Sequence, residues 1–224
     1  RVIIQWLGGM GLMIFIIALF PKVKEGELKI FFSDIQDNTF RPLYNKVTTT
    51  ARILWFIYLV FTIIGFLALY IAGQNWFDAL SFSLSSVSTG GGVPYNGNIT
   101  HLSIGIKSVI VALMFIAGAN YVIVFQIIAN KKVLRSEELR IYLIGFLVVA
   151  TMLIIMQGAK YQFNFEIIFE TIFNTISFLS TTGFYSNAHF DSSILFVWLI
   201  LFFLMFSGSS TGSSGGGMSI YRLI

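Results

Sequence analysis

The sequence predicts an all-α, polytopic membrane protein built from repeated units of a helix, a re-entrant loop and a second helix. Three observations lead to this fold class. Of the 224 residues, 56% are hydrophobic and 11% are charged, whereas about a quarter of the residues in soluble domains are charged. Apolar runs long enough to cross a bilayer recur along the chain. Two shorter amphipathic segments lie between them, and each ends in a cluster of Ser, Thr and Gly.

Five apolar runs are predicted to be membrane segments, because a hydrocarbon core about 30 Å thick needs about 20 helical residues. They are residues 2–20, 53–72, 104–129, 141–156 and 194–206. We expect no removable signal, because Arg1 leads directly into the first of these runs. The absence of Cys excludes disulfides and thiolate metal sites.

The basic residues predict how these segments are oriented. Twelve of the 14 Lys and Arg residues lie in the connections 21–52 and 131–140 or at the two ends of the sequence. Because basic residues concentrate in cytoplasmic connections, we predict that these two connections face the cytoplasm. The connections 73–103 and 158–193 then face outside, and Lys107 and Lys160 are the two basic residues on that side. The net charge of +4 is therefore a feature of topology, and no nucleic-acid partner is expected.

The two outward connections share one order of features: a polar break, a half-length amphipathic helix and a Ser/Thr/Gly cluster. The first copy consists of Gly73-Gln74-Asn75, residues 76–88 and Thr89-Gly90-Gly91-Gly92. The second copy consists of Gln157-Gly158, residues 165–180 and Thr181-Thr182-Gly183-Phe184. A helix of about 12 residues rises only about 18 Å, so each half-helix must enter the membrane and turn back. Irregular backbone at that depth is tolerated where it lines a watery cavity, which predicts that both clusters line a pore.

This internal repeat divides the chain into four parts. Residues 1–20 are the closing helix of a first pore repeat, and residues 21–47 are a cytoplasmic connection. Residues 48–130 form a second pore repeat, and residues 131–224 form a third repeat that extends through a Gly/Ser-rich loop. The first part then belongs to a repeat whose earlier portion is missing.

The two clusters have the composition of an ion-selectivity filter. A dehydrated potassium ion needs carbonyl oxygens in place of its water shell, and glycine permits the strained backbone that presents them. The negative C-terminal end of each half-helix also favours a cation. The predicted ligands are the backbone carbonyls of a first tract, Thr89, Gly90 and Gly91, and of a second tract, Thr181, Thr182 and Gly183. Potassium is the only bound species expected, and no organic cofactor is predicted.

A third polar stretch interrupts the last apolar run. The predicted gating loop consists of Gly208, Ser209, Ser210, Thr211, Gly212, Ser213, Ser214, Gly215, Gly216 and Gly217, preceded by Ser207. Because the run 194–206 is too short to span the bilayer, this loop begins inside the membrane, below the two tracts. Glycine-rich backbone supplies the hinge freedom that a gate requires. The alternative is a flexible linker that leaves the bilayer.

These motifs resemble the Trk/Ktr/HKT superfamily of potassium transporters, whose four repeats are related to the pore repeats of potassium channels. Five stretches carry the resemblance: Gln5-Trp6-Leu7-Gly8-Gly9-Met10-Gly11, Trp76-Phe77-Asp78-Ala79, Ser88-Thr89-Gly90-Gly91, Ser180-Thr181-Thr182-Gly183-Phe184 and the loop from Gly208 to Met218. The resemblance implies a multi-pass protein of the plasma membrane, which in bacteria is the inner membrane. It also implies a homodimer, surrounded by membrane lipid, on a cytosolic nucleotide-binding regulatory ring. The residues leave open whether sodium is carried as well, because the filter of the first repeat is missing.

Two positions depart from the superfamily pattern. An aromatic residue usually follows the filter Gly, and Phe184 keeps this feature, whereas Gly92 replaces it. We therefore expect weaker support behind the first tract. A basic residue often follows the glycines of the gate, but Ser219 stands there, with Arg222 close by.

Two alternatives belong to other classes of protein. An intramembrane serine protease needs a base within hydrogen-bond reach of its nucleophile. His101 and His189 both lie in outward connections, on the opposite side from Ser207, Ser209, Ser210 and Ser213. A broken-helix secondary transporter of another solute often has inverted repeats, whereas both half-helices here are predicted to enter from the same face.

The remaining polar residues in or near the membrane have two interpretations. Four acidic residues would concentrate cations at the outer mouth: Asp78, Glu166, Glu170 and Asp191. Asp78 and Glu166 fall in the first turns of the half-helices, where an anion stabilises a helix by about 0.3–1 kcal/mol, and we interpret these two as capping residues. Asn120 lies within an apolar run and is expected to bond a neighbouring helix.

Overall fold

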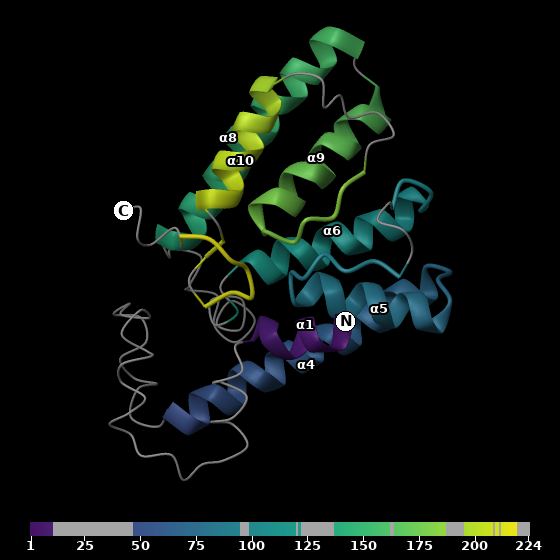
Figure 1. The fold of residues 1–224 in the computed structure, drawn as a ribbon, viewed down its shortest axis with the longest axis vertical. Coiled ribbons are helices and arrows are strands. Elements are labelled where there is room, and N and C mark those ends of the chain that lie inside the picture. The colour runs from purple at the N-terminus through teal and green to yellow at the C-terminus, as the bar shows by residue number, and fades with distance from the viewer. Residues whose placement is uncertain are drawn as a thin grey trace.

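The computed structural model describes residues 1–10, 47–94, 99–119, 121, 137–161, 164–186, 195–207, 209–210 and 212–218. These residues form helices and no strands, in agreement with the predicted all-α class. The helices are α1 (Val2–Gly9), α4 (Val47–Ile71), α5 (Trp76–Val87), α6 (Ile104–Gly118), α8 (Glu137–Tyr161), α9 (Phe165–Leu179) and α10 (Leu195–Ser207) (Figure 1). Predictions for several sites lie outside the described residues: 11–46, Asn120, 131–136, His189, Asp191, Gly208, Thr211, Ser219 and Arg222.

Two of the described helices are long and apolar enough to cross a membrane. These are the segments Ala51–Ile71 of α4 and Leu139–Gly158 of α8, and they match two of the predicted runs. Each whole helix has 25 residues, which corresponds to a length of about 37 Å. Helices α6 and α10 are shorter apolar helices of 15 and 13 residues.

Helices α5 and α9 are the two predicted half-helices. They have 12 and 15 residues, so their lengths of about 18 and 22 Å are well below the thickness of a hydrocarbon core. Each begins after an extended Asn, at Asn75 and Asn164 respectively. Asp78 and Glu166 lie in their first turns, as predicted.

The predicted break at Gln157-Gly158 is wrong, because α8 continues through both residues to Tyr161. A single Gly inside a helix costs only about 1 kcal/mol relative to Ala. Gln157 and Gly158 are both buried, and packing of this kind commonly overrides a weak local preference. The second half-helix begins directly after the extended residue Asn164.

Helix α6 joins two groups of helices. It packs against α4 and α5, which form one group with α1, and it also contacts α9, which packs against α8 and α10 in the other group (Figure 1). The core of the first group includes Phe173 and Ile176 from α9. This packing brings the two half-helices, which lie far apart in the sequence, close to each other.

Long apolar faces of α4, α8 and α10 are exposed. They include Phe56, Ile63, Ile64 and Leu67 of α4, Ile144, Leu147, Val148 and Ile155 of α8, and Phe202, Phe203, Met205 and Phe206 of α10. Soluble monomers rarely expose contiguous apolar surfaces of this kind. Such faces require lipid or another apolar surface as their neighbour.

Candidate ion-coordination site

The first half-helix ends in a turn that closes its last carbonyls. The Thr89 N–H donates to the carbonyl oxygen of Ser86 at 3.3 Å, and the Gly90 N–H donates to that of Ser85 at 2.9 Å. This pair of bonds defines a Schellman motif, in which the residue after the C-cap adopts the left-handed conformation and is usually Gly. Here that residue is Thr89, with a φ of 49°.

The second half-helix ends in the same turn. The Thr181 N–H donates to the Phe178 carbonyl at 3.1 Å, and the Thr182 N–H donates to the Ser177 carbonyl at 2.9 Å. The residue in the left-handed conformation is again a Thr, Thr181, with a φ of 57°. The two tracts therefore leave their helices along matching backbone paths.

This conformation is unusual for the residue type. Among the described residues, Thr89 and Thr181 are the non-glycine residues with positive φ. A β-branched residue in this region is an outlier, and such strain costs about 1–3 kcal/mol and gathers at functional sites. Two residues further on, Gly91 and Gly183 also have positive φ, at 62° and 82°. The backbone pattern Thr, any residue, Gly is thus repeated in conformation as well as in sequence.

The two tracts meet. A Cβ placed on Gly91 would overlap the carbonyl oxygen of Thr182, so the backbone of the first tract lies directly against that of the second. Both tracts also lie at the C-terminal ends of their half-helices. The partial negative charges at these helix ends favour a cation in their vicinity.

The loop after α10 lies against both tracts and is bonded to both of their Thr hydroxyls. The hydroxyl of Thr89 donates to the Ser214 carbonyl at 2.9 Å. The Gly216 N–H donates to the hydroxyl oxygen of Thr181 at 2.7 Å. The loop, drawn in yellow in Figure 1, thereby bridges the ends of α5 and α9.

The described part of this loop, Ser209, Ser210 and residues 212–218, is closed on itself. The Met218 N–H donates to the Phe206 carbonyl at 3.1 Å, and the Ser209 N–H donates to the Gly216 carbonyl at 3.3 Å. A Cβ on Gly215 would overlap the side chain of Ser209 and lie 3.0 Å from the Ser180 carbonyl. Glycine at this position therefore allows the loop to approach the end of α9.

Ser214 binds the loop to the end of α5. Its hydroxyl donates to the carbonyl of Val87, the last residue of α5, at 2.8 Å. The hydroxyl of Tyr121 also donates to that carbonyl at 2.9 Å and lies 3.1 Å from the Ser214 hydroxyl. A carbonyl in the last turn of α5, which has no partner within the helix, is thus satisfied by the loop and by a buried tyrosine.

The residues that follow the second tract contact α5 and the half-helix of their own repeat, α9. Phe184 is 1% exposed, and its ring packs edge-on against Phe82 with 6.1 Å between centroids. The Asn174 side chain accepts from the Ser186 N–H at 3.1 Å and donates to the Ser186 carbonyl at 2.8 Å. The segment that leaves the tract is therefore fixed to α9.

The first tract is supported in a different way. A Cβ on Gly92 would lie 2.6 Å from Oε1 of Gln5 and 3.2 Å from Cγ2 of Val2. Helix α1 therefore occupies the space that an aromatic residue after Gly91 would need. We expected weaker support at Gly92, but α1 takes the place of the missing aromatic side chain there.

An ion pair that the sequence did not reveal lies beside the second tract. Nζ of Lys107 on α6 lies 2.6 Å from Oε1 of Glu170 on α9, and the two side chains are 4% and 6% exposed. The interpretation of Glu170 as a residue of an open outer mouth is therefore wrong, because its carboxylate is buried and neutralised by the ammonium group. The signal available in the sequence was a Lys within an apolar run, which requires a partner.

Comparison with known proteins relates this arrangement to a family. Residues 1–161 match the family described as TrkH, cation transport protein. The Trk system potassium uptake protein TrkH of Vibrio parahaemolyticus is 28% identical over 236 residues, which cover 100% of this chain and 48% of that protein. The protein of the same name from Escherichia coli is 29% identical over 234 residues, with coverage of 100% and 48%.

A solved structure is similar in fold. It is the crystal structure of the potassium transporter TrkH from Vibrio parahaemolyticus, with a TM-score of 0.74 and 28% identity. The match covers 100% of this chain and 46% of that chain. The chain therefore spans about half the length of the relatives that it matches.

Proposed function

The chain belongs to the TrkH family of cation transport proteins, and on that basis we propose that it forms part of a transmembrane pathway for potassium ions. Two of its relatives are named as potassium uptake proteins. The family and these relatives are transporters and not enzymes, which removes the serine-protease alternative. Because the chain corresponds to about half of a relative's length, it supplies part of the pathway.

The proposed selectivity filter is made of the backbone carbonyls of the first and second tracts. The observation that carries this assignment is the left-handed conformation of Thr89 and Thr181 at the ends of two half-helices. Maintaining a strained β-branched residue at two matched positions has a cost that the fold must offset. A filter explains this cost, because carbonyl oxygens must replace the hydration shell of the ion. The contact of Gly91 with Thr182 supports a site to which both tracts contribute.

The proposed gate is the loop after α10. Hydrogen bonds to both Thr hydroxyls hold it against the two tracts, so an ion that passes between the tracts has to pass the loop as well. Its described residues 209–210 and 212–217 are all Ser or Gly, which have small side chains or none. A segment of this composition loses much conformational entropy when it is ordered, so a modest pull on its ends releases it.

The proposed setting is a membrane that the chain crosses several times. Support comes from the two helices of spanning length, from the exposed apolar faces of α4, α8 and α10, and from the family. A location in the bacterial inner membrane, a homodimer, and a cytosolic nucleotide-binding ring stay predictions that rest on the resemblance. Whether sodium accompanies potassium also stays open.

A two-arm uptake experiment on the full-length protein tests the filter and the gate separately. Replacing Gly183 by Ser strains the second tract, so the preference for potassium over sodium is expected to fall. Deleting Gly215 and Gly216 shortens the loop, so unregulated potassium flux is expected to rise at constant ion preference. Normal selectivity in Gly183→Ser at normal membrane abundance contradicts the filter. A shortened loop that changes selectivity but not flux contradicts the gate.

A further inference from the structure

We propose that Lys107 is a positioning residue for the second tract. From α6, which belongs to the preceding repeat, it fixes the segment that leaves the tract and thereby contributes to ion selectivity. This inference rests on the proposed function of the tract as a filter. It assigns a role to a basic residue that lies outside both tracts and the loop.

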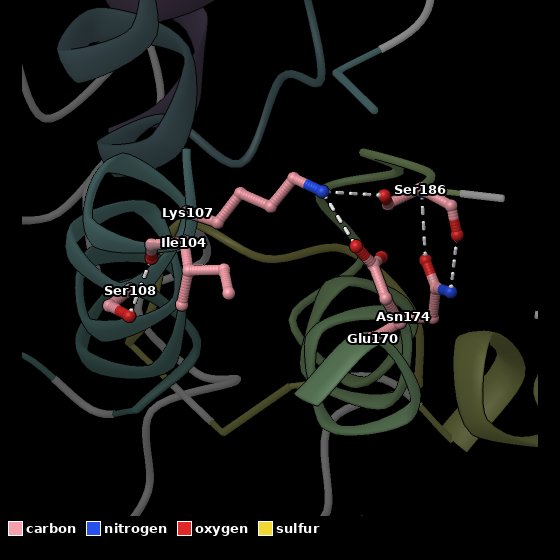
Figure 2. A network of polar contacts seen from close by, with 6 residues as sticks. All are labelled: Ile104, Lys107, Ser108, Glu170, Asn174 and Ser186. Atoms are coloured by element: carbon pink, nitrogen blue, oxygen red, sulfur yellow. Dashed lines mark hydrogen bonds and ion pairs between the residues drawn. The ribbon is translucent and has the colours of Figure 1, made fainter. Parts of the chain in front are cut away.

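The geometry links three elements through one ammonium group. Figure 2 shows the Lys107 side chain crossing from α6 to α9, where Nζ donates to Oε1 of Glu170 at 2.6 Å. The same nitrogen donates to the Ser186 hydroxyl at 3.1 Å. All three side chains are buried. Lys107 therefore holds both the half-helix α9 and the segment that follows the tract.

Ser186 is bonded through each of its polar groups. Asn174 binds its N–H and its carbonyl, and Lys107 binds its hydroxyl (Figure 2). The tract is thus fixed at both ends, by the left-handed turn at Thr181 and by Ser186. Only four residues lie between these two points. Because Asn174 would still bind the backbone of Ser186, removal of Lys107 weakens this second fixed point and lets the intervening carbonyls, including that of Gly183, change direction.

The energetics argue that this ion pair does more than hold the helices together. Removing two charges from water is expensive, and apolar side chains of similar size often stabilise a buried contact as well or better. A charged donor instead provides short, directional bonds to two acceptors on different segments. Glu170 keeps the net charge of the pair at zero, so the ammonium does not repel a cation in the nearby tract.

The test compares matched variants of the full-length protein. The readout is the concentration of sodium that halves rubidium uptake, normalised to membrane abundance. We expect Lys107→Met to lower this concentration about tenfold, which is within the range of couplings between contacting residues. Ser186→Ala removes one bond and leaves the ion pair intact, so a smaller change in the same direction is expected. Lys107→Arg keeps the charge and should restore most of the preference.

Ser108→Ala is the control on the same helix. The Ser108 hydroxyl donates to the Ile104 carbonyl within α6 at 2.8 Å, on the exposed face (Figure 2), so selectivity should stay at the wild-type value. Wild-type selectivity in both Lys107→Met and Ser186→Ala overturns the inference. If Lys107→Met fails to reach the membrane, wild-type selectivity in Ser186→Ala alone overturns it.

Gly183→Ser, measured in parallel, separates this inference from the proposed function. A shift in Gly183→Ser without a shift in Ser186→Ala or Lys107→Met leaves the filter in place and overturns the role of Lys107. Unchanged selectivity in Gly183→Ser contradicts the filter itself, and the role of Lys107 is then overturned with it.

Discussion

The two tracts follow the same backbone path but are held by different neighbours. Both start with a left-handed Thr and continue to a Gly with positive φ. The second tract is followed by a buried Phe184, and its exit is bonded by Asn174. The first tract is followed by Gly92, and α1 fills the space behind it with Gln5.

This difference separates what a repeat must keep from what it can exchange. The turn at the end of each half-helix depends on local hydrogen bonds, which both repeats make. The packing behind each tract depends on whichever element lies there. We conclude that the conformation of a tract is set by its helix end, and that its rigidity is set by its surroundings.

The largest effect is expected for Phe184→Ala. Deleting a buried aromatic side chain typically costs about 3–5 kcal/mol, because a cavity remains. We expect the detergent-solubilised full-length protein to unfold at a clearly lower temperature in a thermal scan. Phe202→Ala, at a position that is 61% exposed on α10, is the matched control. Equal unfolding temperatures for the two variants would show that Phe184 does not support the second tract.

A second effect should distinguish the two glycines. Gly91→Ala introduces both the strain of positive φ and an overlap with the Thr182 carbonyl, whereas Gly183→Ala has open space around its Cβ. Positive φ alone costs roughly 1–2 kcal/mol, and overpacking adds about 1–3 kcal/mol. Potassium uptake should therefore fall much further in Gly91→Ala than in Gly183→Ala. Equal losses would mean that the tracts do not meet as described.

The smallest of these effects is expected at Gly92, which follows the first tract at the position where the superfamily usually has an aromatic residue. Gly92→Ala brings a Cβ to 2.6 Å from Oε1 of Gln5, which should cost about 1 kcal/mol, the low end for overpacking. Adding Gln5→Ala removes that oxygen and should restore thermal stability in a double-mutant cycle. Additive losses in the cycle would argue that α1 does not pack against this position.

Sequence alone predicted the features that depend on local signals. The starts of both half-helices follow polar residues, and their ends are marked by Ser, Thr and Gly, so their bounds agree with the structure to about one residue. The predicted end of α8 was wrong, because Gly158 is only a weak helix breaker when its surroundings are buried. Local signals therefore fail where packing decides.

The partners of individual side chains could not be predicted. Lys107 and Glu170 are separated by 63 residues, and an apolar run around a Lys indicates that a partner exists but not which residue it is. The bonding partners of the loop could not be predicted either. Its length and composition predicted a position below the tracts, without any specific contact. Its bonds to Thr89 and Thr181 depend on the packing of α6 against α9, which no local pattern encodes.

The central claim is that the two tracts jointly bind the transported ion. Diffraction from crystals of the full-length protein soaked in thallium, an anomalously scattering substitute for potassium, tests it most directly. The account predicts an anomalous peak in contact with backbone carbonyls of both Thr89–Gly91 and Thr181–Gly183, and loss of this peak in Gly91→Ala. Thallium bound elsewhere in the membrane region, with neither tract among its ligands, would contradict the account.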